Sequence, residues 1–256
     1  MAGLDWLTAR PIAHRGLHDA AAGVIENTAS AFAAAIAGSY GIETDLQISA
    51  DGEAMVHHDD ALGRLTDGNG RLADMSTAEI KAVRFKASQK TSQKMSQDRI
   101  LTLGELCDLV GGRATLVLEL KSHFDGDRRL VQRTADVLAS YAGPVAVMSF
   151  DPAVVEACRK LAPGLPRGIV AERHYAHPEW DRLPSSEKRR MAHLLHAMRT
   201  RPHFVAYGVK DLPAAAPLIA RWIFGLPLLT WTVRNADDRR RAGRWADQAI
   251  FENIAP

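Results

Sequence analysis

The chain has 256 residues, of which 46% are hydrophobic and 24% charged, which is a soluble globular composition long enough to bury a large core. Its 32 basic and 30 acidic residues leave a net charge of +2, which argues against a dedicated nucleic-acid binder. No apolar run approaches the ~20 residues of a membrane-spanning helix, and the first residues lack a secretory signal pattern. We therefore expect a cytoplasmic protein, in which Cys107 and Cys158 are core residues.

Short β-rich runs alternate with Ala- and Leu-rich helical patterns along almost the whole chain. This alternation predicts a parallel sheet with helices outside, and about eight such units favour a closed (β/α)₈ TIM barrel. An open dinucleotide-binding sheet is the alternative, but no Gly-x-Gly-x-x-Gly follows the first strand. The expected strands cover residues 11–14, 42–49, 54–58, 115–120, 145–150, 167–171, 204–209, 228–233 and 249–254. The expected helices cover residues 28–38, 102–111, 128–141, 152–161, 186–199, 212–222 and 236–246.

Two segments interrupt this alternation. Residues 42–58 hold two expected strands joined by Ala-Asp-Gly, which predicts a hairpin-like excursion. Residues 59–101 then contain one short helical pattern, near 76–84, and a polar loop over 86–99. A long loop after a barrel strand lies on the catalytic face. We therefore interpret the chain as a single domain, residues 1–256, in which residues 59–101 form an active-site insertion.

Three acidic residues stand inside apolar strand patterns. Glu43 and Asp45 are two positions apart on one strand and share a face, and Glu119 interrupts the apolar run 115–120. Buried carboxylates repel one another and are costly to desolvate unless a cation lies between them. Converging oxygen ligands therefore predict a site for Mg²⁺ or Ca²⁺. The alternative is that each carboxylate pairs with an arginine or a lysine.

Histidines end two of the expected strands. His14 and His58 are placed where an imidazole can act as acid or base toward a phosphoryl or acyl group. His57 adjoins His58 and must point the opposite way on a strand, and alternation alone does not choose between them. Arg15 and Lys121 add positive charge that suits phosphate oxygens, or simple ion pairs with the carboxylates.

A set of motifs runs in a fixed order over nearly the whole sequence: IAHRG, ENTASAF, GIETDLQISADGEAMVHHDDALGRLTDGNGRLADMS, LTLGEL, LVLELK, SFDP and TWTV. In these motifs and their order the chain resembles the glycerophosphodiester phosphodiesterases. The resemblance implies a phosphodiesterase-type TIM barrel that uses a divalent cation to cleave glycerophosphodiesters to glycerol 3-phosphate and an alcohol. It would place the chain in glycerol and lipid metabolism, with a small-molecule substrate.

The same resemblance assigns roles to the candidate residues. The family's catalytic histidine precedes Asp and stands shortly before Leu-x-Arg, which selects His58 over His57. The implied roles are His14 and His58 in catalysis, Glu43, Asp45 and Glu119 as metal ligands, Arg15 and Lys121 on phosphate, and Trp231 lining the pocket.

The chain departs from the family's usual pattern at three places. Arg234 stands where Asn usually follows Trp-Thr-Val, Gly63 replaces an Asp, and Phe251-Glu252-Asn253 stands where a Thr-Asp pair is usual. We expect none of these positions to touch the metal or acid–base residues. We expect them instead where the leaving alcohol is recognised, so the alcohol is left open.

Other activities and segments have competing interpretations. A phospholipase D-like or lysophospholipase D-like barrel needs an apolar mouth, whereas the loop 86–99 is polar. A phosphate-binding barrel without catalysis does not need three carboxylates, and a lyase or racemase barrel would use Lys121 as its base. Glu26 is expected to belong to the cap of helix 28–38, with a place near the metal as the alternative. Residues 185–201 predict a helix with a solvated cationic face, with an anionic-lipid contact as the alternative.

Overall fold

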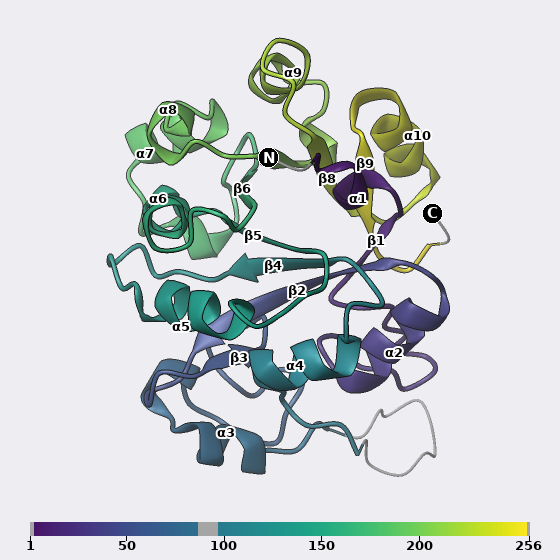
Figure 1. Ribbon diagram of the computed structural model, residues 1–256, viewed down its shortest axis with the longest axis vertical. Helices are drawn as coiled ribbons and strands as arrows, with labels where there is room; N and C mark the ends of the chain where they lie inside the picture. Colours follow the sequence, from purple (N-terminus) through teal and green to yellow (C-terminus); the bar gives the residue numbers. More distant parts are fainter. Residues whose placement is uncertain (1–2, 87–96, 255–256) are drawn as a thin grey trace.

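Eight parallel strands close into a barrel in the computed structural model, which describes residues 3–86 and 97–254 (Figure 1). Closure is made by β1, where Ile12 lies opposite both Gly41 of β2 and Ile250 of β9. The predicted TIM barrel is confirmed. The barrel strands are β1 (Ile12–His14), β2 (Gly41–Ile48), β4 (Leu116–Leu120), β5 (Val145–Ser149), β6 (Arg167–Ala171), β7 (Phe204–Gly208), β8 (Leu228–Val233) and β9 (Gln248–Phe251).

Helices connect most of these strands and surround the barrel (Figure 1). The longer ones carry an apolar face that packs on the strands, as their buried residues show. The helices are α1 (Asp5–Thr8), α2 (Ala29–Ala37), α3 (Thr77–Ala82), α4 (Leu103–Val110), α5 (Arg129–Leu138), α6 (Pro152–Leu161), α7 (Ser185–Ala192), α8 (Ala197–Thr200), α9 (Ala215–Trp222) and α10 (Ala236–Trp245), with 3₁₀ turns η1 (Leu72–Asp74), η2 (Pro178–Trp180) and η3 (Val209–Asp211).

The predicted continuous helix 186–199 is wrong, because the chain turns between α7 and α8. Leu194 has a left-handed φ of 55°, which cannot continue a right-handed helix, and its side chain is buried. Leu195 and Met198 are instead 62% and 86% exposed, so the predicted apolar face is divided. Helix 212–222 begins later than predicted, at Ala215, since Pro213 disfavours helical backbone at the residue before it.

The hairpin-like excursion predicted after β2 is present. The short strand β3 (Ala54–Val56) pairs antiparallel with β2, with Leu46 opposite Val56. The following residues, 59–86, pack beside it around a separate apolar cluster, and residues 87–96 of the predicted polar loop lie outside the described residues. The cluster consists of Met55, Leu62, Leu72, Ile80, Phe85 and Ile100. The use of residues 59–101 as an active-site insertion stays a prediction.

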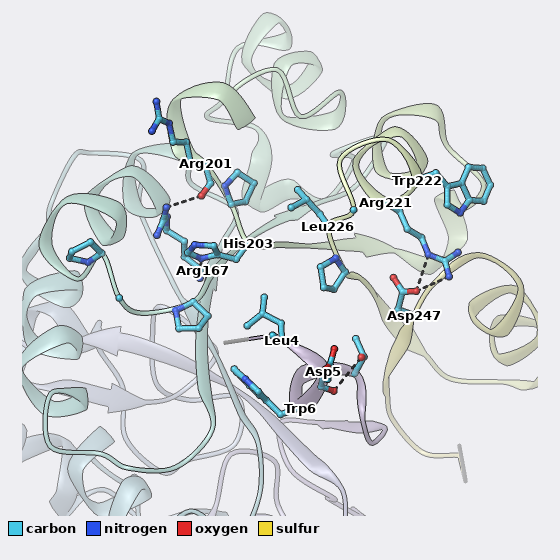
Figure 2. Close-up of a pocket in the computed structure, with 18 residues that line it drawn as sticks. Leu4, Asp5, Trp6, Arg167, Arg201, His203, Arg221, Trp222, Leu226 and Asp247 are labelled. Carbon is cyan, nitrogen blue, oxygen red and sulfur yellow. Dashed lines mark hydrogen bonds and ion pairs between the residues drawn. The ribbon is translucent and has the colours of Figure 1, made fainter. Parts of the chain in front are cut away.

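The amino-terminal end of the barrel carries α1 and a cavity of about 1290 Å³ (Figure 2). Leu7 of α1 is fully buried in the cluster that fills the barrel interior. Figure 2 shows the Arg221–Asp247 ion pair at the cavity wall, and Arg167 donating to the carbonyl of Arg201. Barrel enzymes carry their chemistry at the opposite, carboxyl end of the strands, so this cavity is not the candidate active site. Within the described ranges, no helix is long and apolar enough to cross a membrane.

Candidate active site

A cleft of about 370 Å³ lies at the carboxyl ends of the barrel strands and gathers the predicted residues. Glu43 and Asp45, each 1% exposed, adjoin it through their contact with Glu119. The structure therefore brings together all eight residues chosen from the sequence, although their roles stay predictions. The six that line the cleft are His14, Arg15, His58, Glu119, Lys121 and Trp231.

The three predicted metal ligands form one acidic cluster, defined here as Glu43, Asp45 and Glu119. Asp45 on β2 stands in register with Glu119 on β4, and one oxygen from each of the three carboxylates lies within 4.8 Å of the others. Burial, together with the neighbouring Asp45 and Glu119, raises the pKa of Glu43 well above its ordinary value. A buried set of hard oxygen donors that repel one another fits a cation such as Mg²⁺ or Ca²⁺.

Lys121 and Arg15 supply positive charge to this acidic cluster. Lys121 Nζ lies 2.9 Å from Asp45 Oδ1 and 2.7 Å from Glu119 Oε1, and Arg15 Nε lies 3.3 Å from Asp45 Oδ2. Burial alone would lower the pKa of Lys121, but Asp45 and Glu119 outweigh it and raise that pKa. The ion pairs named as the alternative to phosphate binding are therefore present. They leave both cations beside the cleft, where an anionic substrate can also reach them.

The His-Arg-Gly turn explains how the cleft reaches the acidic cluster. Arg15 has a φ of 56°, and its backbone N–H donates to Glu43 Oε2 at 3.1 Å. Gly16 has a φ of 77°, and a Cβ there would come within 2.9 Å of Ala31. Only glycine fits this close approach without a shift of the α2 backbone. The turn thus points a backbone donor and a guanidinium at two carboxylates of one strand.

His14 belongs to what we term the His14 network: His14, Glu252 and Arg234. Glu252 Oε2 lies 2.9 Å from His14 Nδ1 and accepts the Arg234 guanidinium at 2.9 and 3.1 Å. The hydrogen bond to His14 lowers the pKa of Glu252 to about 2, so Glu252 is an ionised acceptor and Nδ1 must carry the proton. Burial lowers the pKa of His14 to about 4 against the opposing effect of Glu252.

This network overturns one expectation drawn from the sequence. We expected Arg234 and Glu252 to stand apart from the acid–base residues, near the leaving alcohol. Instead they contact one another, and Glu252 contacts His14. The reason is topological: Glu252 follows β9, which pairs with β1, and Arg234 follows β8, the next strand along the closed barrel. Sequence reasoning missed Glu252 because its partner is 238 positions away.

His58 has a comparable set of partners, which we term the His58 network: His58, Asp59 and Arg64. His58 Nδ1 lies 2.8 Å from Asp59 Oδ1, and Arg64 Nε donates to Asp59 Oδ2 at 2.6 Å. Despite partial burial, the hydrogen bonds from His58 and Arg64 lower the pKa of Asp59, so this carboxylate is also an acceptor. Within the part of the chain that the structure describes, Nε2 of neither histidine forms a hydrogen bond.

The structure places His58 on the cleft and buries His57, which is 3% exposed. The predicted strand 54–58 ends earlier, at Val56, so strict alternation does not orient these two side chains. His57 N–H donates to the Asp45 carbonyl at 3.1 Å, and Gln47 Nε2 donates to the His58 carbonyl at 2.9 Å. These two hydrogen bonds hold the turn that places His58 at the cleft.

Glu26 neither caps the first long helix nor joins the acidic cluster. It accepts Arg15 Nη1 and Arg64 Nη2, each at 2.7 Å, and so links the His58 network to Arg15. Thr28 caps α2, as the sequence allowed, by accepting the Ala31 N–H. Asn27 donates to Asp45 Oδ2 at 3.0 Å. The segment Glu26-Asn27-Thr28 therefore makes contacts with active-site residues and also caps helix α2.

Aromatic side chains form one wall of the cleft. Trp231, predicted to line the pocket, contacts Phe150 edge-on at a ring distance of 5.4 Å, and Phe150 contacts Trp180 at 4.8 Å. Phe124 lies edge-on to Trp180 at 6.2 Å. Sequence reasoning missed Phe150 and Trp180. The position of Phe150 directly after β5 is the signal that could have identified it.

A closed barrel with charged and aromatic side chains at the carboxyl ends of its strands defines a TIM-barrel protein with an enzyme-like site. A family model described as the glycerophosphoryl diester phosphodiesterase family matches residues 14–253. The match covers nearly the whole sequence, and the chain belongs to this family. The resemblance noted in the sequence is confirmed.

Relatives and solved structures agree with this family. A glycerophosphodiester phosphodiesterase of Caldanaerobacter subterraneus subsp. tengcongensis is 34% identical over 165 residues, covering 62% of this chain and 65% of the relative. Glycerophosphodiester phosphodiesterase 1 of Mus musculus is 34% identical over 117 residues, covering 44% of this chain and 34% of the relative. The chain thus spans less than two thirds of the length of these relatives.

The fold is shared with solved structures of low sequence identity. A phosphodiesterase of Oleispira antarctica, solved in complex with its product sn-glycerol-3-phosphate, has a TM-score of 0.75 at 23% identity and covers 96% of this chain and 94% of its own. A glycerophosphodiester phosphodiesterase of Thermotoga maritima has a TM-score of 0.67 at 21% identity and covers 94% and 92%. At such identities the likeness concerns the fold.

Proposed function

We propose that this protein hydrolyses glycerophosphodiesters to glycerol 3-phosphate and an alcohol. The observation that carries the proposal is the cleft itself, in which two histidines, whose Nε2 atoms form no hydrogen bond to any described residue, stand beside an acidic cluster, a lysine and an arginine. An anion-binding protein without catalysis would need the cations alone. The family match supports the same activity.

The divalent cation belongs to this proposal. Glu43, Asp45 and Glu119 would hold Mg²⁺ or Ca²⁺, because they offer only hard oxygen donors and are buried together. When bound, such a cation would offset negative charge on the phosphoryl group and favour deprotonation of a nearby hydroxyl.

The protein's own residues would move the protons and hold the phosphate. Arg15 and Lys121 would pair with phosphate oxygens, whose charge grows in the transition state. One histidine would remove a proton through Nε2 from the attacking hydroxyl, of water or of the substrate glycerol. The other would protonate the departing alkoxide, which is otherwise a poor leaving group. Which histidine has which task is left open, and Trp231 with Phe150 would line the space beside the phosphate.

The test is release of glycerol 3-phosphate from glycerophosphocholine and glycerophosphoethanolamine. We expect activity that disappears with EDTA, returns with Mg²⁺ or Ca²⁺, and falls by ~10²–10⁴ in His58→Ala. The matched control is His193→Ala, because His193 is an exposed histidine at the end of α7. Release that is indifferent to EDTA, or retained by His58→Ala, would contradict the proposal.

A second candidate is a lysophospholipase D-like activity on lipid phosphodiesters. The sequence argued against it because the loop 86–99 is polar, but the wall of Phe124, Phe150 and Trp180 offers apolar surface beside the cleft. Release of choline from lysophosphatidylcholine, compared with release of choline from glycerophosphocholine, decides between them, because the lipid would give lysophosphatidate rather than glycerol 3-phosphate. Faster turnover of this lipid than of glycerophosphocholine would favour the second candidate.

A further inference from the structure

Three consecutive elements of the closed barrel bring one histidine, one carboxylate and one guanidinium together. His14 ends β1, Glu252 directly follows β9, and Arg234 directly follows β8. The Glu252 N–H donates to the Val233 carbonyl at 3.0 Å, which fixes the backbone of Glu252 beside that of Arg234. The three side chains therefore meet on a rigid part of the fold.

The carboxylate of Glu252 is surrounded by donors. Arg234 approaches Oε2 with both Nε and Nη2, at 3.1 and 2.9 Å, and Asn253 Nδ2 donates to Oε1 at 3.0 Å. An ionised carboxylate has no proton to donate, so Glu252 is the acceptor in its contact with His14 as well. Nδ1 of His14 is therefore the donor across the 2.9 Å contact. The contact selects one tautomer of neutral His14 and turns its Nε2 toward the acidic cluster, where it lies 3.9 Å from Glu43 Oε2.

We propose that Glu252 and Arg234 are positioning residues for His14: Glu252 holds the Nδ1–H, and Arg234 holds the Glu252 carboxylate in place. The proposal rests on the proposed function, in which Nε2 of His14 exchanges a proton with the substrate. A carboxylate that orients a functional histidine through its second nitrogen is a general device in protein sites. Arg234 is 55% exposed and Glu252 only 15%, so the carboxylate is the more buried partner of the pair.

A simple ion pair between strand ends is the competing explanation, and a matched pair elsewhere in the chain controls for it. Arg133 binds Glu53 with Nε and Nη2, at 2.8 and 2.7 Å, with exposures of 40% and 20%. This pair has similar distances and exposure to Arg234–Glu252, although Arg133 reaches both oxygens of Glu53 and Arg234 only Oε2 of Glu252, and it lies on α5 and the β2–β3 turn. Arg133→Asn therefore reports what losing such a pair costs without any effect on His14.

The kinetic test compares Glu252→Gln, Arg234→Asn and Arg133→Asn with the wild type at saturating divalent cation. We expect Glu252→Gln to lower kcat ~10–100-fold and Arg234→Asn by a smaller factor, with KM changed less than about threefold. Arg234→Lys should recover part of the loss, whereas Arg133→Asn should keep wild-type kcat. Wild-type kcat in Glu252→Gln, or an equal loss in Arg133→Asn, would overturn the proposal.

A second measurement does not depend on turnover. Long-range ¹H–¹⁵N spectra of the protein in EDTA report which ring nitrogen of each histidine carries the proton, and His14→Ala identifies the His14 signals. We expect the Nδ1–H form in the wild type and a mixture of tautomers in Glu252→Ala. An unchanged tautomer in Glu252→Ala would overturn the proposal, even if the wild type released no glycerol 3-phosphate. Absence of that release together with the expected spectra would count against the proposed function alone.

Discussion

The two histidine networks have the same chemical parts but are assembled in different ways. In the His58 network the carboxylate is the next residue, Asp59, and the arginine follows five positions later. In the His14 network the carboxylate comes from the last barrel strand, 238 positions away. The histidines also differ in exposure, at 27% for His58 and 12% for His14.

The two networks also differ in the part of the fold that supports them. The His14 network stands on three adjacent barrel strands, whereas the His58 network stands on the segment that follows β3 and packs on a separate apolar cluster. Arg64 also contacts Glu26, which in turn holds Arg15, so the His58 network is coupled to a predicted phosphate-binding residue. We therefore expect damage to the His14 network to affect proton transfer, and damage to the His58 network to affect substrate binding as well.

The largest expected effect comes from removing either histidine. His14→Ala and His58→Ala should each lower kcat by ~10²–10⁴, because each is expected to transfer a proton in the reaction. The double variant should lose far less than the product of the two losses, since both residues act on one step. Steady-state kinetics of the three proteins measures this. A single variant that keeps more than a tenth of wild-type kcat would remove that histidine from the mechanism.

The next effect separates the two networks. Arg64→Ala should raise KM by about three- to tenfold as well as lowering kcat, because Arg64 shares the Glu26 carboxylate with Arg15. Arg234→Asn should leave KM nearly unchanged. Initial rates over a range of glycerophosphocholine concentrations supply both constants. Equal KM values in the two variants would show that the coupling through Glu26 has no role in binding.

The burial of His14 predicts that folding stability depends on pH in the acid range. The pKa of His14 is lowered to about 4 from an ordinary value near 6.5, so between these values the unfolded chain binds a proton that the folded protein does not. Folding stability should therefore fall as the pH drops from 6.5 to 4. His14→Gln should reduce this fall by about 1–3 kcal/mol in EDTA, measured by urea unfolding at each pH.

His196 provides the reference for that measurement. It is 5% exposed, lies outside both networks, and burial also lowers its pKa to about 4. His196→Gln should flatten the pH dependence in the same direction while leaving kcat at the wild-type value. If neither variant changes the slope, burial of these histidines does not govern acid stability.

The smallest effect is expected where an arginine–carboxylate pair touches no histidine and no cleft. Arg240 and Asp237 form such a pair on α10, with exposures of 72% and 79%. Exposed pairs contribute little, so Arg240→Ala should shift Tm by less than ~2 °C and leave kcat unchanged. A larger change would show that surface pairs in this chain carry more energy than the comparison of the two networks assumes.

The sequence by itself determined the barrel and most of the candidate site. Alternating strand and helix patterns are local, and in a parallel barrel every strand delivers its carboxyl end to the same face. Glu43, Asp45 and Glu119 could therefore be placed together before their distances were known. Asp59 stands beside His58 in the chain, within the motif that identified this histidine.

Only the tertiary structure decided which distant residues meet. Barrel closure sets β9 between β1 and β8, and this brings Glu252 to His14 and Arg234 to Glu252, against the expectation that these two residues stand apart from the acid–base residues. The left-handed backbone of Leu194, whose side chain is buried, interrupts the helix that the apolar spacing favoured. The spacing of residues within one segment shows which helix or strand that segment can form. Contacts across the barrel depend in addition on how all the segments pack together when the barrel closes.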